Sequence, residues 1–141
     1  MTCAFFGHHD CPSSIKPQLY GAIKTQIEKG TTTFYVGNHG AFDRLVLSCL
    51  RELKKTYKEI DYAVVLAYLP SNATEYLANE TVFPEGIEKT PKRFAIDFCN
   101  RWMIGHADTI IAYINHSWGR AAKYVKIANN KGIIVINLAD N

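Results

Sequence analysis

The chain has 141 residues, of which 48% are hydrophobic and 21% charged, and its formal net charge at pH 7 is +3. This size and composition are typical of one globular domain, so residues 1–141 are expected to form a single domain. No apolar run approaches the roughly 18 residues needed to cross a bilayer, and no signal peptide is recognisable. We therefore expect a soluble, cytoplasmic protein without a membrane partner.

The first elements follow one another closely. The β-favouring apolar run 2–6 ends at Gly7 and predicts a buried strand. Apolar residues then recur every four positions from Ile15 to Ile27, which predicts a helix that Gly30 terminates.

A second strand and helix follow, and then a third strand. Residues 33–36 are β-branched and aromatic, and an apolar helical stripe runs from Phe42 to Leu53. The continuously apolar run 62–69 predicts a strand covered on both faces, which Pro70 ends. Basic residues on the far side of the second helix are expected to form a solvated surface: Arg51, Lys54, Lys55 and Lys58.

The second half of the chain begins with an aperiodic segment. A long loop is expected at about 70–90, and such a length is typical of a lid or a mobile segment. Pro91 begins the next predicted helix, and strands at 109–114 and 133–138 flank a last helix at 121–131.

This alternation predicts an α/β fold, namely a Rossmann-like three-layer domain with a mostly parallel five-stranded sheet. Right-handed crossovers favour the strand order 3-2-1-4-5, with the predicted strands numbered along the chain. Ligands of such sheets bind beyond the carboxyl ends of the strands. The loops that follow the strands are therefore the candidate site.

Three polar loops are expected to meet at this edge, at 7–10, 37–43 and 115–120. Their glycines allow the backbone to approach a ligand, and free amides near Gly119 would attract a phosphate. Arg120 would add positive charge at the same place.

Other residues of these loops have two interpretations each. Ser117 is a candidate N-cap of the last helix, and Trp118 a candidate to stack on a base. Phe42 continues an apolar stripe, which favours the core over ligand contact. Asp43 either binds a ligand or complements the dipole of its helix. Gly7 and Gly37 serve either a ligand or a tight turn.

The loops also hold most of the histidines, namely His8, His9, His39 and His116. A metal centre completed by Asp10 or Cys11 is an alternative interpretation. It is disfavoured because the adjacent side chains of His8 and His9 point apart in an extended segment and no HxH or HExxH spacing is present. The four cysteines form no CxxC pair. No metal and no cofactor are therefore expected.

Four short motifs together resemble a known group of proteins. They are Gly7-His8, Gly-Asn-x-Gly-Ala-Phe-Asp at 37–43, Asn-Arg-Trp-Met at 100–103 and Ser-Trp-Gly at 117–119. The combination resembles the SLOG superfamily (Smf/DprA and LOG), and within it the small single-domain bacterial and phage proteins of unassigned function. The resemblance implies a Rossmann-like nucleotide-binding fold and a homodimer. The ligands that it implies range from nucleoside monophosphates to signals of the cyclic ADP-ribose type.

The chain departs from LOG enzymes, which release a base from a nucleoside monophosphate. Their catalytic glutamate corresponds to Lys123, which cannot accept a proton as a carboxylate does. Their arginine corresponds to Cys99, with Arg101 two residues further on. His9 stands where related proteins have an arginine, and Arg120, in place of a glycine, could supply that charge.

Arg101 therefore has two interpretations. The resemblance implies that basic residues of 100–103 approach a bound phosphate, whereas the spacing alone favours an ion pair with Asp97.

Three functions remain open. The first is binding of a nucleotide or a nucleotide-derived signal at the carboxyl ends of the strands, as a sensor or a sequestering module. The second is hydrolysis of an N-glycosidic or phosphate bond, with carboxylates from Asp10, Asp43, Glu85 or Glu88. The third is a DNA-associated accessory domain, which is disfavoured because the sequence shows no basic face.

The predicted ligand-binding residues are Gly7, His8, Gly37, Asn38, Gly40, Asp43, Arg101, Ser117, Trp118, Gly119 and Arg120. The catalytic residues are unknown.

Overall fold

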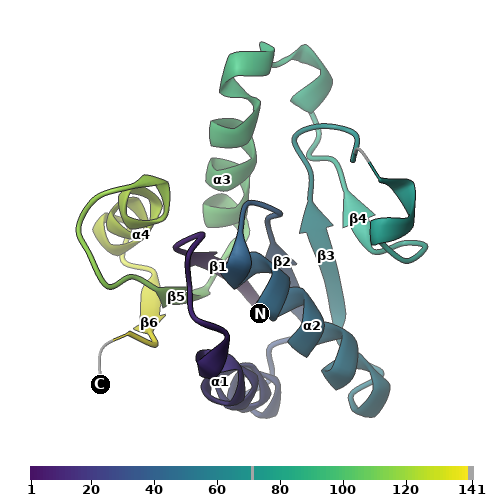
Figure 1. Cartoon of the computed structure of the whole chain (residues 1–141), viewed down its shortest axis with the longest axis vertical. Helices are drawn as coiled ribbons and strands as arrows, with labels where there is room; N and C mark the ends of the chain where they lie inside the picture. Colours follow the sequence, from purple (N-terminus) through teal and green to yellow (C-terminus); the bar gives the residue numbers. More distant parts are fainter. Residues whose placement is uncertain (71, 140–141) are drawn as a thin grey trace.

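The computed structural model describes residues 1–70 and 72–139, and it contains one parallel sheet of six strands in the order β4-β3-β2-β1-β5-β6 (Figure 1). The strands are β1 (Thr2–Gly7), β2 (Thr33–Val36), β3 (Asp61–Val65), β4 (Thr81–Val82), β5 (Thr109–Tyr113) and β6 (Ile134–Asn137). The α-helices are α1 (Lys16–Glu28), α2 (Ala41–Thr56), α3 (Ala95–His106) and α4 (Arg120–Asn130). Short 3-10 helices lie at Ser13–Ile15, Ala73–Glu75, Ile87–Lys89 and Lys92–Phe94.

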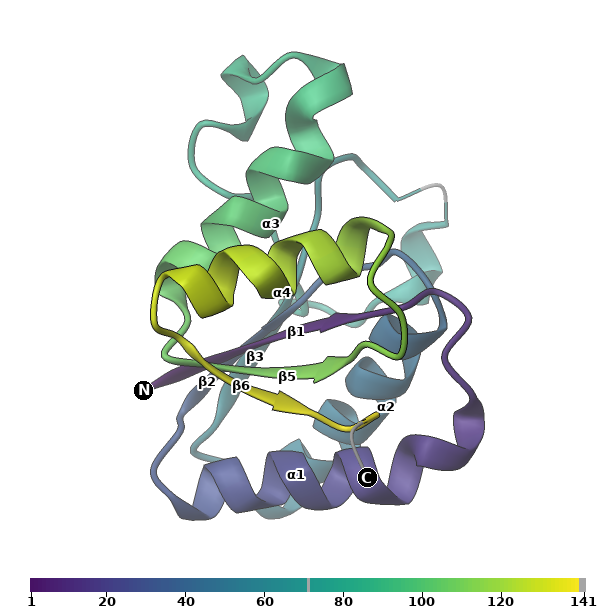
Figure 2. The same ribbon diagram turned by 90° about the vertical axis from the view of Figure 1, so that its left-hand side faces the viewer.

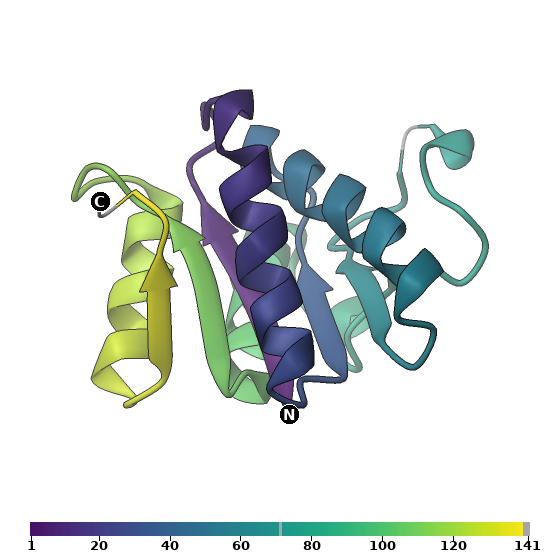
Figure 3. The ribbon, with the colours of Figure 1, turned by 90° about the horizontal axis from the view of Figure 1, so that it is seen from below.

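The helices form a layer on each face of the sheet, so the predicted α/β fold is confirmed. Figure 2 shows α3 and α4 above the sheet and α1 and α2 below it, and Figure 3 shows α1 and α2 from their outer side. Alternate residues of β1 supply the two cores. Phe5 packs with α1 and α2, whereas Phe6 packs with α3 and α4.

The sheet differs from the prediction at one edge, because the segment predicted as a loop contains β4. This two-residue strand pairs with the end of β3, Val64 with Thr81 and Val65 with Val82. The predicted count of five strands was therefore wrong. β3 also ends at Val65 rather than at Leu69, a residue that is 83% exposed.

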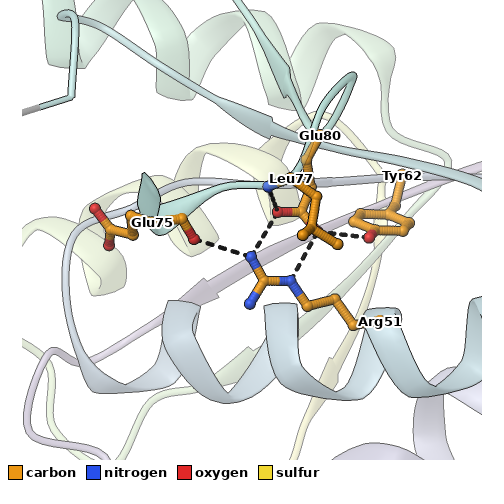
Figure 4. A network of polar contacts seen from close by, with 5 residues as sticks. All are labelled: Arg51, Tyr62, Glu75, Leu77 and Glu80. Atoms are coloured by element: carbon orange, nitrogen blue, oxygen red, sulfur yellow. Dashed lines mark hydrogen bonds and ion pairs between the residues drawn. The ribbon is translucent and has the colours of Figure 1, made fainter. Parts of the chain in front are cut away.

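A buried carboxylate anchors this segment to α2 (Figure 4). Arg51 donates two hydrogen bonds to Glu80, from Nε to Oε2 at 2.7 Å and from Nη2 to Oε1 at 2.6 Å. The Tyr62 hydroxyl and the Leu77 amide also donate to this carboxylate, and Arg51 Nη2 donates to the backbone oxygen of Glu75. Burial alone would raise the pKa of Glu80, but the hydrogen bonds from Arg51 and Tyr62 lower it to about 2. Arg51 is thus part of an ion pair and not simply a solvated charge.

Each of the four cysteines is buried and has a free thiol. Burial raises the pKa of Cys11, Cys49 and Cys99 to about 11, and that of Cys3 further still. In the part of the chain that the structure describes, no helix combines the length and the apolar character needed to cross a membrane.

Candidate functional site

A cavity of about 600 Å³ lies at the carboxyl ends of the central strands β1, β2 and β5. All three loops that the sequence singled out contribute to its wall. The loop residues are Gly7, His8, His9, Asp10, Gly37, His39, Asp43, His116, Trp118, Gly119 and Arg120. Strands and helices supply the rest of the lining, which is Phe5, Phe6, Asn100, Met103, Ala121 and Tyr124.

Backbone hydrogen bonds join the three loops. The amide of His8 donates to the carbonyl oxygen of Tyr113 at 3.2 Å, which links the loop after β1 to the end of β5. The amide of Ala41 donates to the carbonyl oxygen of His9 at 2.9 Å, which links the same loop to the start of α2. The β1 loop is therefore held from both sides, and its position is defined by the sheet and not only by its own sequence.

Gly40 is required where the first two loops meet. Its φ of +154° is rarely adopted by other residues, and a Cβ atom there would lie 2.4 Å from His9 Cβ and 2.5 Å from His9 Cα. We expect Gly40→Ala to lower the free energy of unfolding by about 1–3 kcal/mol, because strain and overpacking add. Gly21→Ala is the matched control, since a Cβ there meets no atom within 4 Å in the middle of α1. This control should be stabilising by up to about 1 kcal/mol. Chemical denaturation measures the free energy of unfolding of both variants. If the two substitutions had equal effects, a glycine would not be required at position 40.

Asp43 lies in the first turn of α2 and closes its own loop. Its Oδ2 atom accepts a hydrogen bond from the His39 amide at 2.8 Å. Burial raises the pKa of Asp43 to about 6, although this hydrogen bond and the nearby Arg44 oppose the shift. Burial and the charge of Arg120 lower the pKa of His39. The cavity therefore has a carboxyl group with a pKa of about 6, well above that of an ordinary aspartate.

Three aromatic rings form a continuous stack on one side of the cavity. The rings of His8 and His116 have centroids 3.6 Å apart, and those of His116 and Trp118 are 3.7 Å apart. His8 is 5% exposed and Trp118 is 68% exposed, so the stack runs from the interior to the surface.

The N-terminus of α4 forms a further part of the wall through Gly119, Arg120 and Ala121. The first amides of an α-helix have no partner within the helix, so they attract anions. Gly119 has φ +98° and occupies the N-cap without a side-chain hydrogen bond. The prediction that Ser117 caps this helix was therefore wrong.

Seven of the predicted ligand-binding residues line the cavity: Gly7, His8, Gly37, Asp43, Trp118, Gly119 and Arg120. Four others lie outside its lining. Gly40 lies against His9, where the first two loops meet. The side chain of Asn38 hydrogen-bonds to Tyr76. Ser117 is exposed beside the stack. Arg101 forms an ion pair with Asp97, with Nε 3.0 Å from Oδ2, which agrees with the structural interpretation of this arginine.

Phe42 is fully buried, as the prediction of a core residue required. Its ring occupies the space beside Gly7, where a Cβ atom would lie 2.2 Å from Phe42 Cγ. Gly7 thus allows α2 to approach β1 closely.

The predicted ligand-binding residues did not include the helical part of the cavity, although Asn100 and Met103 belong to the motif at 100–103 that carries the resemblance. Asn100 is buried on α3 and hydrogen-bonds to the Tyr124 hydroxyl of α4, which in turn donates to Asp97. Met103 lines the cavity one turn further along α3. The motif at 100–103 was the available signal, but the prediction took only Arg101 from it, because the helix periodicity does not show which residues face the cavity.

Within residues 1–70 and 72–139, no group of three or more His, Cys, Asp or Glu side chains is arranged to hold a metal ion. No protein-family model matches the chain, and a search of curated proteins found no match either.

Proposed function

We propose that the chain binds a nucleotide or a nucleotide-derived signal in this cavity, as a sensor or a sequestering module. The observation that carries the proposal is that one cavity combines the N-terminus of α4 and Arg120 with the exposed ring of Trp118. A helix N-terminus beside an arginine suits a phosphate, and a flat aromatic ring suits a base. The volume of about 600 Å³ is in the range of about 300–1,000 Å³ typical of ligand pockets.

The charges on the wall favour a ligand with few negative charges. Among the described lining residues there is one arginine, Arg120, and no lysine, while Asp10 and Asp43 are acidic. Lys123 makes an ion pair with Asp97 at 3.8 Å instead. The resemblance to the SLOG superfamily supports the same ligand class, and it also favours a homodimer.

The test is to identify the ligand that the protein carries. Protein purified from cells is heated, the released small molecules are analysed by mass spectrometry, and a panel of nucleoside monophosphates and cyclic dinucleotides is titrated by calorimetry. We expect a nucleotide-type molecule to be released or bound. Absence of any such molecule, together with no heat of binding across the panel, would contradict the proposal.

Hydrolysis of the bound nucleotide is a second candidate function, favoured by the carboxyl group of Asp43 in the cavity. In such a reaction, a water oxygen would form a bond to the anomeric carbon, and Asp43 would take its proton. The departing base would keep the electron pair of the broken C–N bond.

Asp43→Asn tests this second function with nucleoside monophosphates as substrates. If the wild-type protein releases base, Asp43→Asn should reduce the rate by about 10²–10⁴-fold, the usual contribution of a general base, while leaving nucleotide affinity in place. Because the pKa of Asp43 is raised to about 6, the wild-type rate should increase with pH through this value. Asp61→Asn, which removes an exposed carboxylate outside the cavity, is the control. Wild-type protein that releases no base would contradict this second function and leave the binding proposal intact.

A further inference from the structure

The stack of His8, His116 and Trp118 contains two buried ring nitrogens without a partner. His8 Nε2 and His116 Nδ1 have no hydrogen-bond partner among the residues that the structure describes. A buried polar atom without a partner costs free energy, and such atoms are rare in folded proteins. Both atoms belong to rings in the wall of the cavity. These two nitrogens could therefore form hydrogen bonds with a ligand in the cavity.

The hydrogen-bonding state of His8 follows from its surroundings. The backbone of His116 raises the pKa of His8, which is the effect of a carbonyl oxygen beside a ring nitrogen. Because Nε2 has no partner, we infer that this nitrogen is Nδ1 and that it carries the proton, which leaves Nε2 of the neutral ring with a free lone pair. In this state His8 can accept a hydrogen bond and cannot donate one from Nε2.

The surroundings of His8 favour the neutral form of its ring. Burial is the largest influence and lowers the pKa of His8, and the nearby His116 and His9 lower it as well. Asp10 and the hydrogen bond with the His116 backbone raise it, but the net shift is downward.

His8 Nε2 has almost no accessible surface, so something must move before a ligand reaches it. The ring of His116 stacks directly on His8, and the exposed Trp118 lies on His116. The loop that carries both rings is largely exposed, from Asn115 to Gly119. This loop covers His8 and has few side chains buried in the core.

We propose that His8 is a specificity-determining residue whose Nε2 accepts a hydrogen bond from an uncharged donor on the ligand. His116 and Trp118 cover this atom until a ligand displaces them. The donor is a hydroxyl of a ribose or an amino group of a base, because both are common to nucleotides and neither requires a charged partner. This inference rests on the proposed nucleotide-binding function.

The first experiment needs no ligand. Two-bond proton–nitrogen correlation NMR of the wild-type protein at pH 7 reports which nitrogen of His8 carries a proton. We expect a neutral ring with the proton on Nδ1. A charged ring, or a proton on Nε2, would overturn the inference.

The second experiment uses four probes: AMP, its 2′-deoxy and 3′-deoxy forms, and purine riboside 5′-monophosphate, which lacks the amino group. Binding is followed by calorimetry and, in a Trp102→Phe background, by the fluorescence of Trp118. We expect AMP to change this fluorescence and one analogue to bind about tenfold more weakly, which would identify the donor.

Two substitutions of His8 complete the test. His8→Phe keeps a flat ring without an acceptor, and it should bind AMP about tenfold more weakly and lose the preference among the probes. His8→Gln places a carbonyl oxygen near the position of Nε2 and should keep most of the affinity. His106→Phe is the control, because His106 is exposed on α3 outside the cavity.

Three outcomes would count against the proposal in different ways. Equal affinity of His8→Phe and wild type for AMP would overturn the role of His8 alone. An affinity of the wild type that increases on acidification, but not in His8→Phe, would show that a charged His8 binds phosphate, which also overturns it. Wild-type protein that binds none of the four probes would contradict the proposed function for this ligand class, and the inference would fall with it.

Discussion

Arg120→Glu is expected to abolish nucleotide binding without destabilising the fold. The substitution removes a charge-assisted hydrogen bond to phosphate, worth about 1.5–3 kcal/mol, and places a like charge where the phosphate would lie. Together these effects should lower affinity by more than about 100-fold. Arg120 is the first residue of α4, where a glutamate interacts favourably with the helix dipole, so the melting temperature should not fall.

Lys126→Glu makes the same change of charge on an exposed position of α4 outside the cavity. Calorimetry with a bound nucleotide should show near wild-type affinity for this control and for Arg101→Ala, since Arg101 pairs with Asp97 away from the cavity. If Lys126→Glu weakened binding as much as Arg120→Glu, the effect would be one of net charge, and the phosphate would not lie at the start of α4.

The second large effect concerns the ion pair that anchors the segment after β3. Removing one partner of a buried pair costs about 3–5 kcal/mol, but the Arg51 side chain is 35% exposed, so water compensates in part. We expect Arg51→Ala to lower the free energy of unfolding by about 2–3 kcal/mol at pH 7, as measured by chemical denaturation. Lys55→Ala, on the same helix and exposed, is the control and should change stability by less than about 0.5 kcal/mol.

The same pair makes stability depend on pH. The pKa of Glu80 is lowered from 4.5 to about 2 in the folded protein, so the folded state binds the proton less readily than the unfolded chain. Its contribution is therefore fully present above about 4.5 and is lost as the pH falls toward 2. Glu80→Gln cannot titrate, and its stability should vary less than that of the wild type across this range. Parallel pH profiles for the two proteins would show that Glu80 is not responsible.

Much of the fold could be predicted because long elements carry repeated signals. The apolar stripe from Phe42 to Leu53 predicted a helix from several regularly spaced residues, and the apolar run at 109–114 predicted a strand in the same way. β4 could not be predicted, since two residues have no periodicity. The residue before them, Glu80, pairs with Arg51, which lies far away in the sequence.

The candidate site also has parts that the sequence predicts and parts that it does not. Loop residues such as Gly119 and Arg120 could be placed because the topology of a parallel sheet brings their loops to one edge. Whether Arg101 faces the cavity depended on a helix rotation that the sequence did not define. The stacking of His116 between His8 and Trp118 involves three side chains from two loops, and no local pattern signals it.

The burial of every native thiol makes the chain a convenient host for site-specific labels. Alkylating reagents react with thiolates, and each cysteine is enclosed by the cores with its ionisation suppressed. A single cysteine introduced at an exposed position, such as Ser117, should therefore be modified far faster than the native four. A fluorophore attached there would report on the loop between β5 and α4 without removal of any native cysteine.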